Sequence, residues 1–291
     1  MFSSLIASTG LPVIPGTNIS RHTRHRPGIS DAVKLHIICL ESLTSTRNFS
    51  NFAKNVGIMK KLVVLSGSGI SAESGISTFR GGGGMWNNYR VEDVASIEGW
   101  YRNPGMMIDF YNEMRQSLKE HEPNEAHLLL KELEKDFQVT VITQNVDNLH
   151  ERAGSSHIIH LHGEVTKVRP EDCYTDRDNY SLKYVQDIGY GTIALGDKGG
   201  PHQKQLRPHI VWFGEAVPNI EAAANEVSTA DILLIIGTSL QVYPAAGLSA
   251  YAPYGCNTYV IDPADIQARG ATHIKAVATA GMREFVKIIK L

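Results

Sequence analysis

Apolar and polar residues follow two kinds of pattern along the chain from residue 59 onward. Some segments are short and continuously apolar or β-branched, as expected for strands covered on both faces. Others carry apolar residues at helical spacing, which predicts helices. The strand candidates are LVVL (62–65), QVTVIT (138–143), HIIHLHGEV, RPHIVWFGE, DILLIIGTS and NTYVID, and the helix candidates include PNEAHLLLKELEKDF and NLHERAG.

This alternation of strands and helices predicts an α/β fold with a doubly wound, Rossmann-like parallel sheet. Ligands bind such sheets in the crevice at the carboxyl ends of the strands. We therefore expect the segments that directly follow the strands to lie along one edge: GSGIS, TQNVDN, HGE, WFGE and GTS.

Two insertions interrupt the alternation. The segment from about 81 to 122 reads as mostly helical, and the segment from about 166 to 206 is rich in Tyr, Asp and Gly with weak periodicity. We expect both to form a smaller lobe over the crevice of a catalytic domain that spans 59–291.

The first 58 residues differ from the rest in being rich in Ser, Thr, Arg and Pro, with no acidic residue before Asp31. Three interpretations remain open: an organellar transit peptide, a disordered tail, or a start codon assigned too early, since Met59 closely precedes the first strand. A transit peptide would make the protein mitochondrial.

Composition narrows the class of protein. A formal net charge of −2 over 291 residues gives no case for a nucleic-acid partner, and no apolar run of about eighteen residues indicates a membrane span. The three cysteines, Cys39, Cys173 and Cys256, form no paired motif. A disulfide framework is therefore not expected, and we expect a reducing, cytoplasmic location unless the first 58 residues are a transit segment.

A glycine pattern follows the first strand. Gly67, Gly69 and Ala72 fit the G-x-G-x-x-G/A spacing that lets a backbone approach a pyrophosphate, although a glycine-rich turn without a ligand gives the same spacing. The acidic residue that dehydrogenases place about twenty positions later is missing, because GGGGMWNNYRVED is not a strand end. A bound dinucleotide would therefore be held differently from that of a dehydrogenase.

Polar side chains follow the second strand in TQNVDN. Gln144, Asn145 and Asp147 could orient a ribose and stabilise positive charge that develops at a glycosidic bond. The alternative is a helix cap, with Asn145 or Asp147 preceding NLHERAG.

Two histidines alternate in IHLHGE, so on a strand they share a face. A third metal ligand beside His160 and His162 is not evident. His162, at the strand end, suits a general base open to the crevice, and a satisfied core imidazole is the alternative.

Five motifs occur in order at domain-scale spacing: GSGISAESGISTFRG, TQNVDNLHERAG, HLHGE, RPHIVWFGE and GTSLQVYPAAGL. Together they resemble the sirtuins, the NAD-dependent protein-lysine deacylases, and the resemblance extends from Lys60 to the C-terminus. STFRG is similar to the branch that includes bacterial and desuccinylase-type enzymes.

The resemblance implies positions for NAD. The residues expected at the pyrophosphate are Gly67, Ser68, Gly69, Ile70 and Ser71, with Phe79 and Arg80 over the nicotinamide ribose. Those expected around that ribose and the nicotinamide are Gln144, Asn145 and Asp147. Those expected at the adenine-side phosphate and ribose are Gly237, Thr238 and Ser239, with Asp262 accepting from a ribose hydroxyl.

The resemblance also implies the reaction. The acyl-lysine oxygen attacks the anomeric carbon as nicotinamide leaves, His162 as base lets the 2′-oxygen attack the resulting imidate, and water releases lysine and 2′-O-acyl-ADP-ribose. Asn145 and Asp147 are expected to act with His162 as catalytic residues. The acyl-lysine tunnel is expected to involve Val211, Phe213, Gly214 and Glu215. Mono-ADP-ribosyl transfer, NAD hydrolysis and a non-catalytic NAD or ADP-ribose-binding module remain as alternatives.

Two departures from the family pattern matter. Members that remove acidic acyl groups carry Tyr-x-x-Arg, whereas FYNEMRQ places Met114 after Tyr111, with Arg115 one position later. Arg115 shares a helix face with Tyr111 and is retained as a substrate-binding candidate, but Met114 favours acetyl or longer apolar acyl groups.

Most sirtuins also hold zinc with two Cys-x-x-Cys pairs. Only Cys173 lies between His162 and residue 207, so we predict no zinc.

Overall fold

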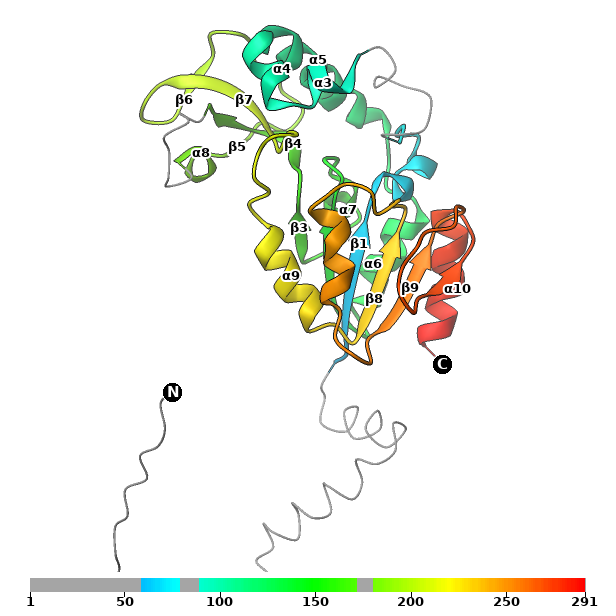
Figure 1. Cartoon of the computed structure of the whole chain (residues 1–291). Helices are drawn as coiled ribbons and strands as arrows, with labels where there is room; N and C mark the ends of the chain where they lie inside the picture. Colours follow the sequence, from blue (N-terminus) through cyan, green and yellow to red (C-terminus); the bar gives the residue numbers. More distant parts are fainter. Residues whose placement is uncertain (1–58, 79–88, 172–179, 291) are drawn as a thin grey trace, which may run out of the picture. The chain divides into compact units, whose positions relative to one another are not determined.

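The computed structural model describes residues 59–78, 89–171 and 180–290 (Figure 1). All of them belong to one compact unit, Ile58–Leu291. The N-terminal extension, Phe79, Arg80 and Cys173 lie outside the described residues. Within them, no helix combines the length and the apolar character that a membrane crossing requires.

The larger lobe is built on a parallel sheet of six strands in the order β10-β9-β8-β1-β2-β3, which confirms the predicted fold class. Its strands are β1 (Lys61–Ser66), β2 (Gln138–Thr143), β3 (Ile158–His160), β8 (Ile232–Ile236), β9 (Asn257–Ile261) and β10 (Thr272–Ile274). The short edge strand β10 was not predicted, since three residues give too little pattern.

Helices cover both faces of this sheet because successive strand residues point to opposite sides. Leu62 and Val64 of β1 share one core with α6 and α10, and Val63 and Leu65 share a second core with α9 and η5 (Figure 1). These helices are α6 (Glu125–Leu133), α9 (Ile220–Ser228), the 3-10 helix η5 (Ala245–Tyr251) and α10 (Ala278–Ile289). Continuously apolar strands are therefore what this sheet requires.

One row of paired residues crosses the whole sheet at its carboxyl edge. The row consists of Ile274, Ile261, Ile236, Ser66, Thr143 and His160. Each strand ends at this row, so the segments that follow the strands emerge side by side.

The smaller lobe has an antiparallel sheet in the order β5-β4-β7-β6 with helices packed against it. Its elements are α3 (Val91–Val94), α4 (Ile97–Arg102), α5 (Pro104–Ser117), η4 (Leu118–Glu120), β4 (Gly163–Pro170), α8 (Tyr180–Lys183), β5 (Gln186–Asp187), β6 (Lys198–Gly199) and β7 (Lys204–Ile210). Its core is aromatic, with Trp100 stacked on Trp212 at a ring separation of 5.3 Å.

The segment RPHIVWFGE was grouped with the parallel strands, and this assignment was wrong. Its first four residues, 207–210, form the end of β7, which pairs antiparallel with β4 in the smaller sheet, and its other residues follow that strand. An apolar run shows that a strand is buried but not which sheet it joins. Gly163, with φ of +83°, begins β4 directly after the short β3 and His162, so the chain changes sheets there.

Two glycine turns at the carboxyl edge touch through their backbones. The Gly67 amide donates to Ile236 O at 3.0 Å, and the Gly69 amide donates to Gly237 O at 2.8 Å. A Cβ on Gly237, where φ is +62°, would lie 2.4 Å from Ile70 N, so a side chain there would push the two turns apart.

Gly237→Ala is expected to lower the free energy of unfolding by about 3 kcal/mol, because a left-handed backbone cost adds to a backbone clash. Gly270→Ala is the matched control, since Gly270 has a φ of +69° with no atom within 4 Å of its Cβ position. It is expected to cost only about 1 kcal/mol. Urea unfolding measures both, and equal losses would contradict the close contact.

Candidate active site

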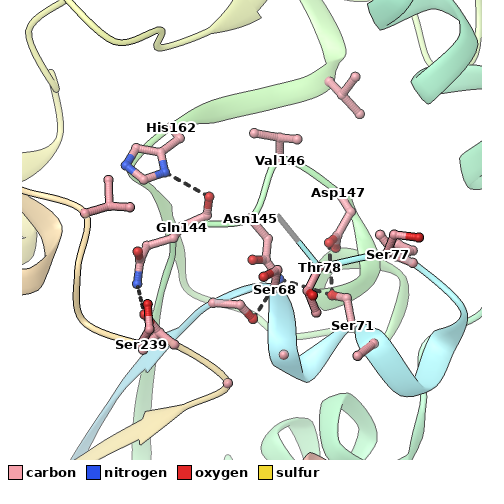
Figure 2. Close-up of a pocket in the computed structure, with 18 of the residues that line it drawn as sticks. Ser68, Ser71, Ser77, Thr78, Gln144, Asn145, Val146, Asp147, His162 and Ser239 are labelled. Atoms are coloured by element: carbon pink, nitrogen blue, oxygen red, sulfur yellow. Dashed lines mark hydrogen bonds between the residues drawn. The ribbon is translucent and has the colours of Figure 1, made fainter. Parts of the chain in front are cut away.

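A cavity of about 770 Å³ lies between the carboxyl edge of the parallel sheet and the smaller lobe (Figure 2). The turn after β1 forms its floor, in two short 3-10 helices, η1 (Ser68–Ile70) and η2 (Ala72–Ser74). Gly67, Ser68, Gly69 and Ser71 line the cavity. Ile70 does not, because its side chain is fully buried in the core beneath the turn.

The segment 144–147 after β2 is tied to both glycine turns through its side chains (Figure 2). Gln144 Nε2 donates to Thr238 Oγ1 at 2.9 Å. Asn145 Nδ2 donates to Gly67 O at 3.2 Å and to Ser71 Oγ at 3.1 Å. The three polar residues of this segment therefore line the cavity in fixed orientations.

The Asp147 carboxylate accepts hydrogen bonds on both of its oxygens. Its Oδ1 accepts from the Leu149 amide at 3.1 Å, at the start of α7 (Leu149–Arg152), and its Oδ2 accepts from Ser71 Oγ at 3.0 Å. The carboxylate also lines the cavity. Burial raises the pKa of Asp147, and the two hydrogen bonds oppose that rise.

His162 lines the cavity from the segment that follows β3 (Figure 2). Its Nδ1 lies 3.0 Å from Gln144 O, and a carbonyl can only accept, so Nδ1 carries the proton. Burial lowers the pKa of His162, which keeps the ring neutral at pH 7. Nε2 is then unprotonated, which a general base requires.

The far end of the cavity lies along β8 and β9. Gly237, Thr238, Ser239 and Asp262 all line it. The segment after β10, where Ala276 and Val277 complete this wall, was not predicted. Small apolar residues carry no chemical signal, so only the position of β10 reveals them.

The opposite wall is the segment after β7. Val211, Phe213, Gly214 and Glu215 line the cavity. The Phe213 amide donates to Ala95 O at 2.9 Å, so this segment lies against the start of the helical insertion.

Glu215 lines this wall but is also bound to the protein. Arg207 pairs with its carboxylate at 2.7 Å and 2.9 Å, and the Trp212 amide donates to Glu215 Oε2 at 2.8 Å. Glu215 therefore shapes the wall through contacts within the chain. Trp212, which was not predicted, lines the same wall.

The structure separates the three residues of the Tyr111 motif. Tyr111 and Met114 line the cavity, but Arg115 does not. Arg115 is fully buried, and its Nε donates to Val165 O at 2.6 Å. One further residue along α5 turns the side chain toward β4, so the expectation that Arg115 reaches the substrate needs correction. Arg115 holds the smaller lobe together instead.

The hydroxyl of Tyr111 is already engaged. It donates to Val94 O at 3.0 Å and accepts from Trp212 Nε1 at 3.0 Å. Among the described residues that line the cavity, none is a lysine or arginine.

One group of metal-ligand types occurs among the described residues: Glu151, His160 and Glu164. Each is already in an ion pair, His160 with Glu151 at 2.6 Å and Glu164 with Lys167 at 2.7 Å. We assign no metal to this group. The absence of zinc stays a prediction from the cysteine count.

A glycine turn, a polar segment and a neutral histidine at the carboxyl edge of a parallel sheet define a dinucleotide-using α/β enzyme. Residues 67–244, more than half of the chain, match the Sir2 family. The chain belongs to the Sir2 family.

Three similar proteins illustrate the match. An NAD-dependent protein deacylase of Bacteroides thetaiotaomicron is 54% identical over 236 residues, which cover 79% of this chain and 98% of that protein. A crystal structure of a Sir2 homolog–NAD complex has a TM-score of 0.69 and 34% identity, covering 83% and 93% of the two chains. A Sir2 complex with a deacetylated p53 peptide and 3′-O-acetyl ADP ribose has a TM-score of 0.65 and 27% identity, covering 82% and 97%.

Thr238→Val is expected to weaken ADP-ribose binding about fivefold, because it removes the acceptor of Gln144 at unchanged volume. Thr140→Val is the control. It removes a hydrogen bond of 2.9 Å to Glu226 outside the cavity and should leave binding unchanged. Calorimetric titration with ADP-ribose measures both, and wild-type affinity in Thr238→Val would refute a role for the contact.

Proposed function

We propose that the chain removes acyl groups from protein lysine side chains with NAD as co-substrate, giving nicotinamide, 2′-O-acyl-ADP-ribose and free lysine. The relative from B. thetaiotaomicron is named an NAD-dependent protein deacylase, and the match covers 98% of that protein. The observation that carries the proposal is the neutral His162, held by Gln144 O beside the cavity.

NAD fits the cavity along the row of strand ends. The small residues at Gly67–Gly69 let the backbone approach the pyrophosphate, and Asp262 suits a ribose hydroxyl at the adenine side. Asn145 and Asp147 then lie at the nicotinamide end. A related Sir2 homolog binds NAD in its solved structure.

In this arrangement NAD supplies the carbon that the acyl oxygen attacks as nicotinamide leaves. The Asp147 carboxylate and the Asn145 side chain stabilise positive charge beside it. His162 Nε2 takes the proton of a ribose hydroxyl, while Nδ1 keeps its own proton on Gln144 O. Trp212 and the segment around it exclude water from the acyl side.

The lining of the cavity favours attack on NAD by an acyl-lysine side chain over attack by water. Its smaller-lobe side is apolar, lined by Val165, Ile210, Val211, Trp212 and Met114. NAD hydrolysis or ADP-ribosyl transfer to a polar acceptor would leave this side without a role. A Sir2 relative was solved with a deacetylated peptide, which supports acylated proteins as partners.

The same side favours an apolar acyl group. Met114 lines it, the Tyr111 hydroxyl is used within the protein, and Arg115 points away. A carboxylate at the end of an acyl chain would therefore have no cation to pair with among the described lining residues. We propose acetyl or a longer apolar acyl group as the substrate.

His162→Ala is expected to lower deacylation of an acetyl-lysine peptide at least about a hundredfold, because the general base is lost. Binding of ADP-ribose should change little. His157→Ala, at an exposed histidine, is the control. Since burial lowers the pKa of His162, the wild type should lose activity only as the pH falls below 6.5. Unchanged turnover in His162→Ala would refute the mechanism.

Met114→Arg is expected to raise the ratio of kcat/KM for succinyl-lysine over acetyl-lysine about tenfold, because a guanidinium pairs with the added carboxylate. Met114→Gln separates charge from polarity and should leave the ratio nearly unchanged. Peptide turnover measured by mass spectrometry gives both ratios. A wild type that prefers succinyl-lysine would contradict the proposed acyl specificity.

A further inference from the structure

Three consecutive backbone carbonyls of the segment 144–147 are held by donors from the segment 160–165. His162 Nδ1 lies 3.0 Å from Gln144 O, His160 Nδ1 lies 3.3 Å from Asn145 O, and the Val165 amide lies 2.9 Å from Val146 O. The polar segment that lines the cavity is therefore fixed from behind by its main chain, in addition to its side-chain contacts.

His160 differs from the other two donors because its second ring nitrogen is also bound. Nε2 lies 2.6 Å from Glu151 Oε1, on α7. Asn145 O and the Glu151 carboxylate can only accept hydrogen bonds, so both ring nitrogens carry protons when both contacts form. His160 is then a cation, whereas His162 is neutral with a single acceptor on Nδ1.

His160 is buried, and its main chain is fixed by neighbouring elements. The His160 side chain is only 8% exposed, and its carbonyl accepts from Asn219 Nδ2 at 2.9 Å. His160 is the last residue of β3 and pairs with Thr143 of β2 in the sheet. Its main chain is therefore fixed, and its ring links α7 to the backbone of Asn145.

We propose that His160 is a positioning residue for the deacylation reaction. As an imidazolium it bridges the Glu151 carboxylate and Asn145 O, and so holds Asn145 and Asp147 where they receive the nicotinamide end of NAD. His160 does not line the cavity. It acts through the backbone of the segment 144–147, and its role in the reaction depends on the function proposed above.

The surrounding charges favour the cation. Burial opposes it, but the Glu151 carboxylate, with help from Glu164 on β4, outweighs burial and raises the pKa of His160. Other ionisable groups close to His160 come from several elements. They are Asp147 before α7, His150 on α7, His209 on β7, and Lys167, which pairs with Glu164 at 2.7 Å.

The direction of the pH effect follows from the raised pKa. The bridge is complete at pH values below the ordinary pKa of histidine and is lost as the pH rises through the higher pKa of folded His160. Above that pH the ring keeps one proton, so one of its two contacts breaks and the segment 144–147 loosens. Without the Glu151 charge, the same loss occurs at lower pH.

Glu151→Gln tests this directly, because it keeps an acceptor near His160 but removes the charge. NMR titration of the full chain, with the His160 resonance assigned by its loss in His160→Gln, is expected to show a pKa about one unit lower in Glu151→Gln. At a pH midway between the two measured pKa values, ADP-ribose binding and the KM for NAD should worsen in Glu151→Gln by up to about fivefold. At about pH 5.5 the difference should largely disappear, and kcat should change less than KM.

Glu122→Gln is the matched control. Glu122 pairs with Arg152 of the same helix α7 at 2.6 Å, and its loss should change neither the His160 titration nor binding. His160→Gln should bind ADP-ribose weakly, with no pH dependence from residue 160. A wild-type His160 pKa at or below 6.5 would overturn the proposal. So would ADP-ribose binding by Glu151→Gln equal to that of the wild type at a pH midway between the two measured pKa values.

The NMR and ADP-ribose measurements require no turnover, so the two proposals fail separately. A chain that deacylates no peptide but shows the predicted titration and binding shifts refutes the proposed reaction and leaves the bridge intact. Normal deacylation with an unshifted His160 refutes the bridge alone.

Discussion

The active site depends on the register of the parallel sheet. Hydrogen-bonded pairing places Ser66, Thr143, His160 and Ile236 in one row, together with the ends of β9 and β10. The chain leaves every strand at this level, so residues far apart in sequence become neighbours and contact one another, as Gln144 does Thr238. A shift of one strand by one residue would turn its side chains to the opposite face. A register that keeps the core packed therefore also keeps the site residues in position.

Above this row, the segment 144–147 is the element on which the site converges. Its side chains reach forward to the two glycine turns, and its carbonyls are held from behind by two histidines and a backbone amide. Such double fixation orders polar groups before the substrate arrives, which reduces the entropy cost of binding. The two histidines also differ in their contacts. His162 lines the cavity and has one acceptor, on Nδ1, whereas the buried His160 has an acceptor at each ring nitrogen.

The sequence predicted the parallel sheet well because its strands are continuously apolar and end in distinctive polar motifs. The cavity residues of these motifs, including Gly67, Asn145 and His162, could be chosen for the same reason. The smaller sheet was not foreseen, since β5 and β6 have two residues each and β7 resembles a strand of the main sheet.

The direction in which a side chain points was the other feature that the sequence did not predict. Arg115 was a reasonable substrate ligand by spacing, yet its guanidinium binds Val165 O inside the smaller lobe. Ile70 was expected at the pyrophosphate, yet its side chain packs in the core. The pairing of His160 with Glu151 was also invisible, because it joins residues of two different elements whose contact depends on the fold.

The balance of products tests the central claim most directly. The protein is incubated with NAD and an acetyl-lysine peptide, and nicotinamide, free-lysine peptide and acetyl-ADP-ribose are quantified together by mass spectrometry. The account predicts equal amounts of the three products and little nicotinamide without the peptide. Nicotinamide release at the same rate without the peptide, or no acetyl-ADP-ribose, would contradict it.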